Sequence, residues 1–211
     1  MSDESYYSRL KPHISLLKMI EYLQQNWLEV LGIITSLICV WLNTRQNIWG
    51  WFWAIVSSGI YAVIFWQSNL KSDAELQIVF ILLSLYGVYE WKFSKGEKAV
   101  LPVSKIPFQS IIICLIFLGL FTVISGYLHS EYLGASLPYL DSSLTAISLI
   151  ATWMTARKYL ENWLLWIGAN ISYVGMYIYK GLNGTSVLYI LLIVLAVKGF
   201  VDWRRSMRTC V

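Results

Sequence analysis

Charged residues, histidines and centrally placed acidic groups are scarce in this sequence. Only 13% of its 211 residues are Asp, Glu, Lys or Arg, and the two histidines, His13 and His129, fall in a predicted tail and loop. The acidic residues near apolar runs all lie close to the ends of those runs. The sequence therefore has no Ser-His-Asp set, no cluster of metal ligands and no glycine-rich phosphate loop. These absences argue against an enzyme, against a metal or other cofactor, and against a proton-coupled carrier, which generally needs a titratable group in its path.

Cysteine is also rare, and nothing in the sequence indicates a secreted or nucleic-acid-binding protein. Cys39, Cys114 and Cys210 are isolated and form no CxxC pair, which argues against a redox or metal site. The net charge of +4 comes mostly from short loops, as membrane topology alone requires, so we expect no nucleic-acid partner. The polar N-terminus lacks the short apolar core of a secretory signal.

Apolar runs are what the chain has in abundance. Hydrophobic residues make up 57% of the sequence, and its mean hydropathy is +0.58. Because a helix needs about 20 mostly apolar residues to cross a bilayer, we predict an all-α integral membrane protein with seven transmembrane helices. The spans are expected at about 27–43, 48–67, 74–92, 106–128, 139–156, 161–180 and 184–203. Residues 1–26 predict an N-terminal amphipathic helix at the interface, with a frayed tail as the alternative.

Basic residues are distributed unequally between the two sides of the predicted membrane protein. Ten fall in the loops after the first, third and fifth spans and in the C-terminal tail, against five in the N-terminal tail and the other loops. The positive-inside rule therefore predicts a cytoplasmic C-terminus and an external N-terminus.

The chain contains an internal repeat at an offset of 112 positions. The matched pairs include Trp41 with Trp153, Arg45 with Arg157, Trp51 with Trp163, Tyr61 with Tyr173, Gly87 with Gly199, and Trp91 with Trp203. They predict two three-helix repeats, 27–92 and 139–203. The repeats face the same way because an unmatched helix lies in the linker 93–138, and a tail, 204–211, follows. This 3+1+3 plan is typical of transporters that hold substrate near the midplane, between parallel repeats.

One face of the sixth predicted helix carries aromatic and amide groups at helical spacing. They are Trp163, Trp166, Asn170, Tyr173 and Tyr177. We interpret this face as a cavity lining. The alternative, a belt of aromatic residues at the interface, does not account for Asn170 near the middle of the span. The repeat places Ala54 and Ser58 opposite Trp166 and Asn170, so the two halves share a frame but differ in recognition groups.

Two further features suggest a flat, partly polar ligand. Gln77 lies about one turn inside the third predicted span, where an amide is costly in lipid unless it faces the protein interior or a wet cavity. The 11 Trp and 14 Tyr residues exceed what interface belts require. Aromatic rings stack on flat ligands, and they stack more strongly on cationic ones.

The pattern W-x-x-W-x-x-x-N at Trp163, Trp166 and Asn170, followed by YIYKGL at 177–182, is specific enough to suggest a family. Together with the stretch from Asp73 to Trp91 and the 3+1+3 plan, it resembles the PnuC nicotinamide riboside transporters of bacteria. The resemblance covers essentially the whole chain after the N-terminal tail. It implies a fold related to the SWEET sugar transporters and a homotrimer in the bacterial inner membrane. It also implies import of nicotinamide riboside, a vitamin B3 precursor for NAD biosynthesis, by facilitated diffusion. A cytoplasmic kinase would trap the riboside by phosphorylation.

The resemblance also implies a set of substrate-binding residues. These are Trp163, Trp166, Asn170, Tyr173 and Tyr177 from the sixth helix, with Asn47, Trp49, Trp53 and Gln77 from the first repeat. The stretch NIWGW departs from the Asn-Trp-Pro-like residues expected there, so whether Trp49 or Trp51 faces the pocket stays open. Two alternatives remain for the function: a thiamine or riboflavin transporter with the same frame, and a membrane receptor that transports nothing.

Overall fold

Seven helices make up the secondary structure of the described part of the chain. The structure, a computed structural model, describes residues 26–67, 71–93, 101–133, 137–179 and 183–209, so the predicted amphipathic helix at 1–26 lies almost wholly outside it. The helices are α2 (Trp27–Thr44), α3 (Trp49–Gln67), α4 (Lys71–Phe93), α5 (Phe108–Leu133), α6 (Pro138–Ala156), α7 (Asn162–Tyr179) and α8 (Asn183–Thr209). Each matches one predicted span to within a few residues at most ends, although α5 and α8 extend about five or six residues further at their C-terminal ends.

Five of these helices are long and apolar enough to cross a membrane. The qualifying segments are Trp27–Thr44, Trp49–Gln67, Asp73–Phe93, Phe108–Tyr132 and Ser186–Thr209. Helices α6 and α7 form where spans were predicted but are less apolar, because α6 is rich in Ser and Thr and α7 carries Asn, Trp and Tyr. Ten of the 19 residues of α6 are buried, whereas α7 has both buried and exposed positions.

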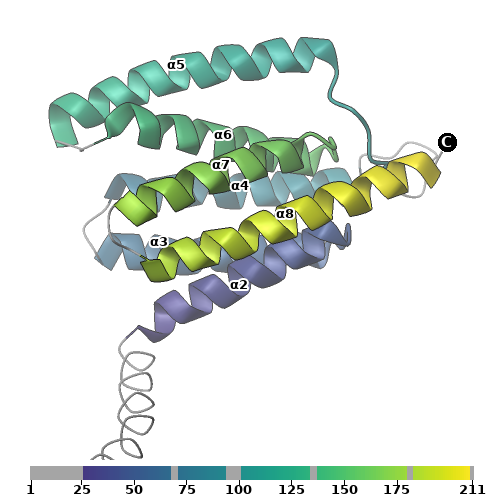
Figure 1. The fold of residues 1–211 in the computed structure, drawn as a ribbon, viewed down its shortest axis with the longest axis horizontal. Coiled ribbons are helices and arrows are strands. Elements are labelled where there is room, and N and C mark those ends of the chain that lie inside the picture. The colour runs from purple at the N-terminus through teal and green to yellow at the C-terminus, as the bar shows by residue number, and fades with distance from the viewer. Residues whose placement is uncertain (1–25, 68–70, 94–100, 134–136, 180–182, 210–211) are drawn as a thin grey trace, which may run out of the picture.

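Six of the helices form a closed ring, and the seventh lies outside it. Around the ring, α2 contacts α3, α3 contacts α4, α4 contacts α6, α6 contacts α7, α7 contacts α8, and α8 contacts α2. Among the described helices, α5 packs only on α6, and Figure 1 shows it along the outer edge of the molecule, with α2 at the opposite edge. The predicted connecting helix therefore takes no part in the ring.

Helices α2 and α6 end in the same way, 112 positions apart. At the end of α2, the N–H of Gln46 donates to the carbonyl of Asn43, and the N–H of Asn47 donates to that of Leu42. Lys158 and Tyr159 make the corresponding bonds after α6. Gln46 and Lys158 both have φ of 53°, so each occupies the left-handed position of a Schellman cap. These caps turn the chain sharply into α3 and α7.

Candidate functional site

A cavity of about 320 Å³ lies inside the ring of six helices. Every ring helix contributes to its wall, and α5 does not. The lining residues are Ser36, Cys39, Val40 and Asn43 of α2; Trp51, Ala54, Ser57, Ser58 and Tyr61 of α3; Gln77, Phe80 and Ser84 of α4; Ser148, Thr152 and Thr155 of α6; Trp163, Trp166, Asn170 and Tyr173 of α7; and Tyr189, Leu192 and Ala196 of α8. None of them is charged, so recognition inside the cavity depends on aromatic faces, hydroxyls and amides.

The cavity wall follows the internal repeat almost residue for residue. All but Cys39 and Ser57 have a lining partner 112 positions away. Three pairs are identical: Ser36 with Ser148, Trp51 with Trp163, and Tyr61 with Tyr173. The other pairs differ: Val40 with Thr152, Asn43 with Thr155, Ala54 with Trp166, Ser58 with Asn170, Gln77 with Tyr189, Phe80 with Leu192, and Ser84 with Ala196. An asymmetric ligand would therefore meet different groups on the two sides.

The structure brings most of the predicted substrate-binding residues of α7 and α4 to this cavity. Trp163, Trp166, Asn170, Tyr173 and Gln77 all line it. Asn170 is buried, and the ring of Tyr173 lies 4.9 Å from that of Tyr189 on α8. Tyr177 is on the same helix, but its side chain lies outside what the structure describes. Whether these residues bind substrate stays a prediction, while their convergence on one cavity is established.

The predicted residues near the start of α3 are not brought to the cavity. Trp49 is 61% exposed, and the side chain of Asn47 accepts a hydrogen bond from the backbone N–H of Trp49 at 3.0 Å. Trp53 is half-buried and packs edge-on against Phe52, away from the cavity wall. Trp51, only 1% exposed, lines the cavity instead. Residues 49 and 53 share a helix face that position 51 does not, because each residue turns a helix by about 100°.

The internal repeat predicts that Trp51 faces the cavity. Its partner at the offset of 112 is Trp163, a residue already assigned to the cavity, whereas the partners of Trp49 and Trp53 are Glu161 and Leu165. The repeat therefore favoured Trp51, while the family pattern favoured its neighbours.

Four buried tryptophans form a layer across one end of the cavity. Trp51 packs edge-on against Trp91 with ring centroids 5.5 Å apart, Trp91 contacts Trp203 at 6.2 Å, and Trp203 packs edge-on against Trp163 at 5.4 Å. The indole N–H of Trp91 donates to the carbonyl of Ala156 at 3.1 Å, and that of Trp203 to the carbonyl of Asn43 at 2.9 Å. The layer thus links the ends of α4 and α8 to the caps of α6 and α2.

Two glycines let this layer pack closely. A methyl group on Gly199 of α8 would lie 2.6 Å from the ring of Trp163, and one on Gly87 of α4 would collide with the ring of Trp51. Each indole therefore lies directly on the backbone of the facing helix.

We expect Gly199→Ala to destabilise the protein and weaken ligand binding together. Overpacking in a dense core costs about 1–3 kcal/mol, and the added methyl must push Trp163 toward the cavity. Thermal unfolding and ligand titration in detergent measure both effects. Gly168→Ala is the matched control, because a methyl there meets no atom within 4 Å. Equal losses in the two variants would contradict the close packing of Trp163.

The hydroxyls of the wall are largely satisfied within the protein. Those of Ser84, Ser148 and Thr152 donate to carbonyls one turn back on their own helices at 2.7–2.9 Å. The hydroxyls of Ser36 and Ser57 are 2.7 Å apart and join α2 to α3. These groups therefore contribute more to helix packing than to a free binding surface.

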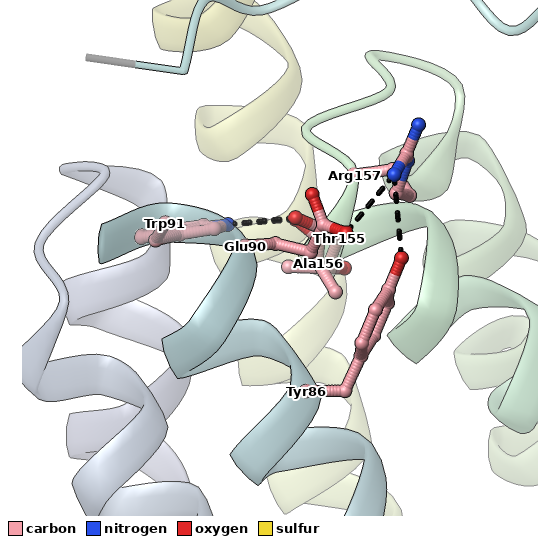
Figure 2. Close-up of polar contacts among 6 residues, drawn as sticks. All are labelled: Tyr86, Glu90, Trp91, Thr155, Ala156 and Arg157. Atoms are coloured by element: carbon pink, nitrogen blue, oxygen red, sulfur yellow. Dashed lines mark hydrogen bonds and ion pairs between the residues drawn. The ribbon is translucent and has the colours of Figure 1, made fainter. Parts of the chain in front are cut away.

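Polar contacts beside the tryptophan layer join α4 to the end of α6 (Figure 2). Arg157 forms an ion pair with the buried Glu90 at 3.0 Å and donates to the hydroxyl of Tyr86 at 3.4 Å. The hydrogen bond to Tyr86 raises the pKa of Arg157 above its ordinary value, so the guanidinium stays charged. Lys158, 2% exposed, lies 4.6 Å from the Trp91 ring centroid and donates to the side-chain oxygen of Gln46 at 3.2 Å.

The equivalent contact between α8 and the end of α2 involves different side-chain interactions. We call these two contacts, between α4 and the end of α6 and between α8 and the end of α2, the two seams. Arg45, the counterpart of Arg157, lies 5.6 Å from the ring centroid of Trp41 on its own helix. Asp202, the counterpart of Glu90, pairs with Lys198 one turn away on α8. Tyr86 in the first half is replaced by Lys198 in the second, which supplies Asp202 with a partner on its own helix. Among the described residues, the ion pair that joins two elements is therefore found only between α4 and the end of α6.

Comparisons with known proteins point to one class. The family model described as nicotinamide mononucleotide transporter matches residues 26–205. The nicotinamide riboside transporter PnuC of Escherichia coli (strain K12) is 27% identical over 87% of each chain. The riboflavin/roseoflavin transporter RibM of Streptomyces davaonensis is 25% identical over 84% of each chain. A crystal structure of the vitamin B3 transporter PnuC superposes with a TM-score of 0.71 at 20% identity, covering 99% of this chain and 93% of that one. The two relatives and the solved structure are transporters, not enzymes, and the solved structure has the same fold.

Proposed function

We propose that this chain, which belongs to the nicotinamide mononucleotide transporter family, imports nicotinamide riboside across the bacterial inner membrane by facilitated diffusion. The observation that carries the proposal is the cavity inside the helix ring, with an uncharged wall of tryptophans, tyrosines and amides. Nicotinamide riboside has a flat cationic ring and a hydroxylated sugar. The ring would stack on Trp166, since aromatic faces attract cations, and the sugar would bond to Asn170 and Gln77.

The cavity wall supports uniport rather than ion coupling. Its described residues include no Asp, Glu, His, Lys or Arg, whereas carriers driven by protons generally hold a titratable group in their path. The riboside would therefore equilibrate across the membrane. Net import would depend on a cytoplasmic kinase that phosphorylates the riboside and so keeps it inside.

Two parallel three-helix repeats, α2–α4 and α6–α8, would supply the alternating access that transport needs. Supporting this plan are the lining pairs at an offset of 112, the matching caps at Gln46 and Lys158, and the tryptophan bonds that each repeat makes to the other. Similar halves around a shared site can rock against each other. The outer helix α5 would join the repeats and orient the second one like the first.

The orientation and assembly of the protein are proposed on separate grounds. The excess of basic residues near the C-terminal ends of α2, α4, α6 and α8 supports a cytoplasmic location for those ends and for the C-terminus. The tryptophan layer would then close the cytoplasmic end of the cavity. The family resemblance favours a homotrimer, and α5 offers an exposed apolar face for a subunit or for lipid.

The second candidate substrate is riboflavin, because a riboflavin/roseoflavin transporter is among the relatives. Thiamine, which also has a flat cationic ring, is a third, and a receptor that transports nothing is the alternative from another class. Calorimetric titration of the purified protein with the three vitamins separates these proposals. We expect saturable binding of nicotinamide riboside and much weaker binding of the other two. Tighter binding of riboflavin or thiamine would replace the proposed substrate.

A further inference from the structure

A short extended segment before α5 is fastened to the turn between α6 and α7. We call this segment, residues 101–106, the strap, and Figure 1 shows it descending from the start of α5 toward the other helices. The backbone N–H of Ser104 donates to the carbonyl of Lys158 at 3.1 Å, and the N–H of Leu160 donates to the carbonyl of Ser104 at 2.9 Å. The strap therefore pairs with the turn as one parallel strand pairs with another.

Side chains of the strap and the turn add to this pairing. Val103 is 6% exposed and belongs to the same buried cluster as the four tryptophans of the layer, and Leu101 packs against that cluster. At the other end of the strap, the N–H of Ile106 donates to the carboxylate of Glu161, in the turn, at 3.0 Å. Apolar burial and three hydrogen bonds thus hold the strap beside the closed end of the cavity.

The strap strengthens one of the two seams. It follows α4 in the chain and binds the turn after α6, so it joins the same two elements as the ion pair between Glu90 and Arg157. The indole N–H of Trp91 adds a hydrogen bond across this seam, to the carbonyl of Ala156 at 3.1 Å. Backbone pairing, an ion pair and an indole bond therefore all keep α4 and the end of α6 together.

The seam between α8 and the end of α2 is held differently. The turn after α2, residues 45–48, makes its backbone hydrogen bonds within its own neighbourhood, and among the described residues none joins it to another segment. The indole N–H of Trp203 donates to the carbonyl of Asn43 at 2.9 Å across this seam, and Lys158 reaches Gln46 from the turn after α6. Neither an ion pair nor a strap reinforces this side in the part of the chain that the structure describes, so it is the easier side to open.

We propose that this end of the cavity opens on one side only: α8 and the end of α2 part, while the strap keeps α4 and the end of α6 together as the hinge. The inference rests on the proposed function, since a transporter must open both ends of its cavity in turn. Two halves that rock against each other turn about the contacts that survive the motion. Substrate would then leave the cavity between α2 and α8.

The test removes one indole N–H from each seam and follows access to the cavity. Trp203→Phe and Trp91→Phe each keep a flat ring and lose a hydrogen bond to the opposite repeat. Cys39 lines the cavity and serves as the probe, with Cys114 and Cys210 replaced by Ser. A small thiol reagent reaches Cys39 when the cavity opens, so its labelling rate in detergent measures the open population.

We expect Trp203→Phe to raise the labelling rate about 3- to 10-fold, the equivalent of one lost hydrogen bond. Trp91→Phe should change the rate less than about twofold. A bond that is kept in both states does not alter the balance between them, whereas a bond that breaks on opening does. An increase in Trp91→Phe that equals or exceeds that in Trp203→Phe overturns the one-sided opening, as does an unchanged rate in both variants.

Val103→Asp tests the strap itself. Burial of a carboxylate among the tryptophans is costly, so the strap should lift from the layer. Trp91→Phe added to Val103→Asp should then raise the labelling rate about 3- to 10-fold, because that seam can also part. Lys105→Asp is the matched control, since it places the same group at an exposed position of the strap, and Trp91→Phe added to it should change the rate less than about twofold.

A milder variant and a parallel assay complete the test. Glu161→Ala removes only the acceptor of Ile106, and it should shift the labelling of Trp91→Phe in the same direction as Val103→Asp. Rates unchanged by both strap variants overturn the role of the strap. Uptake of nicotinamide riboside by wild-type protein in liposomes is measured alongside. Protein that labels as expected but takes up no riboside contradicts the proposed function and leaves the mode of opening intact.

Discussion

Trp166→Ala should weaken the binding of nicotinamide riboside by about 5- to 150-fold. Trp166 is the lining tryptophan with no aromatic partner in the other half, because Ala54 occupies the equivalent place. Stacking of a flat base on an aromatic side chain is worth about 1–3 kcal/mol when measured by alanine substitution, and a cationic ring adds attraction to the indole face. Titration calorimetry on the purified variant gives the change in Kd directly.

Trp49→Ala is the matched control for this prediction. It removes the same side chain from the neighbouring stretch of α3, where Trp49 is 61% exposed and does not line the cavity. Its affinity for the riboside should stay within about twofold of wild type, since surface substitutions away from a site typically change free energies by under 0.5 kcal/mol. Equal losses in Trp49→Ala and Trp166→Ala would show that the cavity is not the binding site.

Arg157→Ala is expected to lower the free energy of unfolding by about 2–4 kcal/mol. The variant removes the guanidinium that forms an ion pair with the carboxylate of Glu90, whose side chain is only 6% exposed. Breaking a buried pair on one side costs about 3–5 kcal/mol, and the partial exposure of Arg157 reduces that figure. Thermal unfolding in detergent measures the loss.

A second substitution identifies the cause of that loss. Adding Glu90→Gln to Arg157→Ala removes the buried charge, so the double variant should recover much of the lost stability. Arg45→Ala is the control from the other half, because Arg45 is exposed and its guanidinium lies over the ring of Trp41. Its substitution should cost under about 1 kcal/mol. A loss as large as that of Arg157→Ala would contradict the difference between the two seams.

The sequence predicted the helices and the aromatic and amide face of α7, because both depend on local periodicity. Apolar runs separated by polar turns predict spans, and a spacing of three or four residues places Trp163, Trp166 and Asn170 on one face whatever surrounds them. The internal repeat also predicts tertiary contacts, since Trp51 packs on Gly87 just as Trp163 packs on Gly199. The polar face of the sixth predicted helix could therefore be assigned before its neighbours were known.

Tertiary contacts decided what local patterns left open. In NIWGWFW, three tryptophans at spacings of two each point in a different direction, and a shift of one residue in the helix start rotates all of them by about 100°. The cap at Gln46 fixes that start. Likewise, Arg45 and Arg157 are equivalent in sequence but make different contacts, because Lys198 already occupies Asp202. Asp202 pairs with Lys198 on its own helix, whereas Glu90 has Tyr86 at the equivalent position and pairs with Arg157.

Uptake by the purified protein in liposomes tests the central claim most directly. Labelled nicotinamide riboside should enter until its concentration is equal on both sides, with no ion gradient imposed. Dissipating proton and sodium gradients should leave the rate unchanged, as expected for a cavity wall without charged residues. Absence of protein-dependent uptake, or accumulation that requires either gradient, would contradict the account.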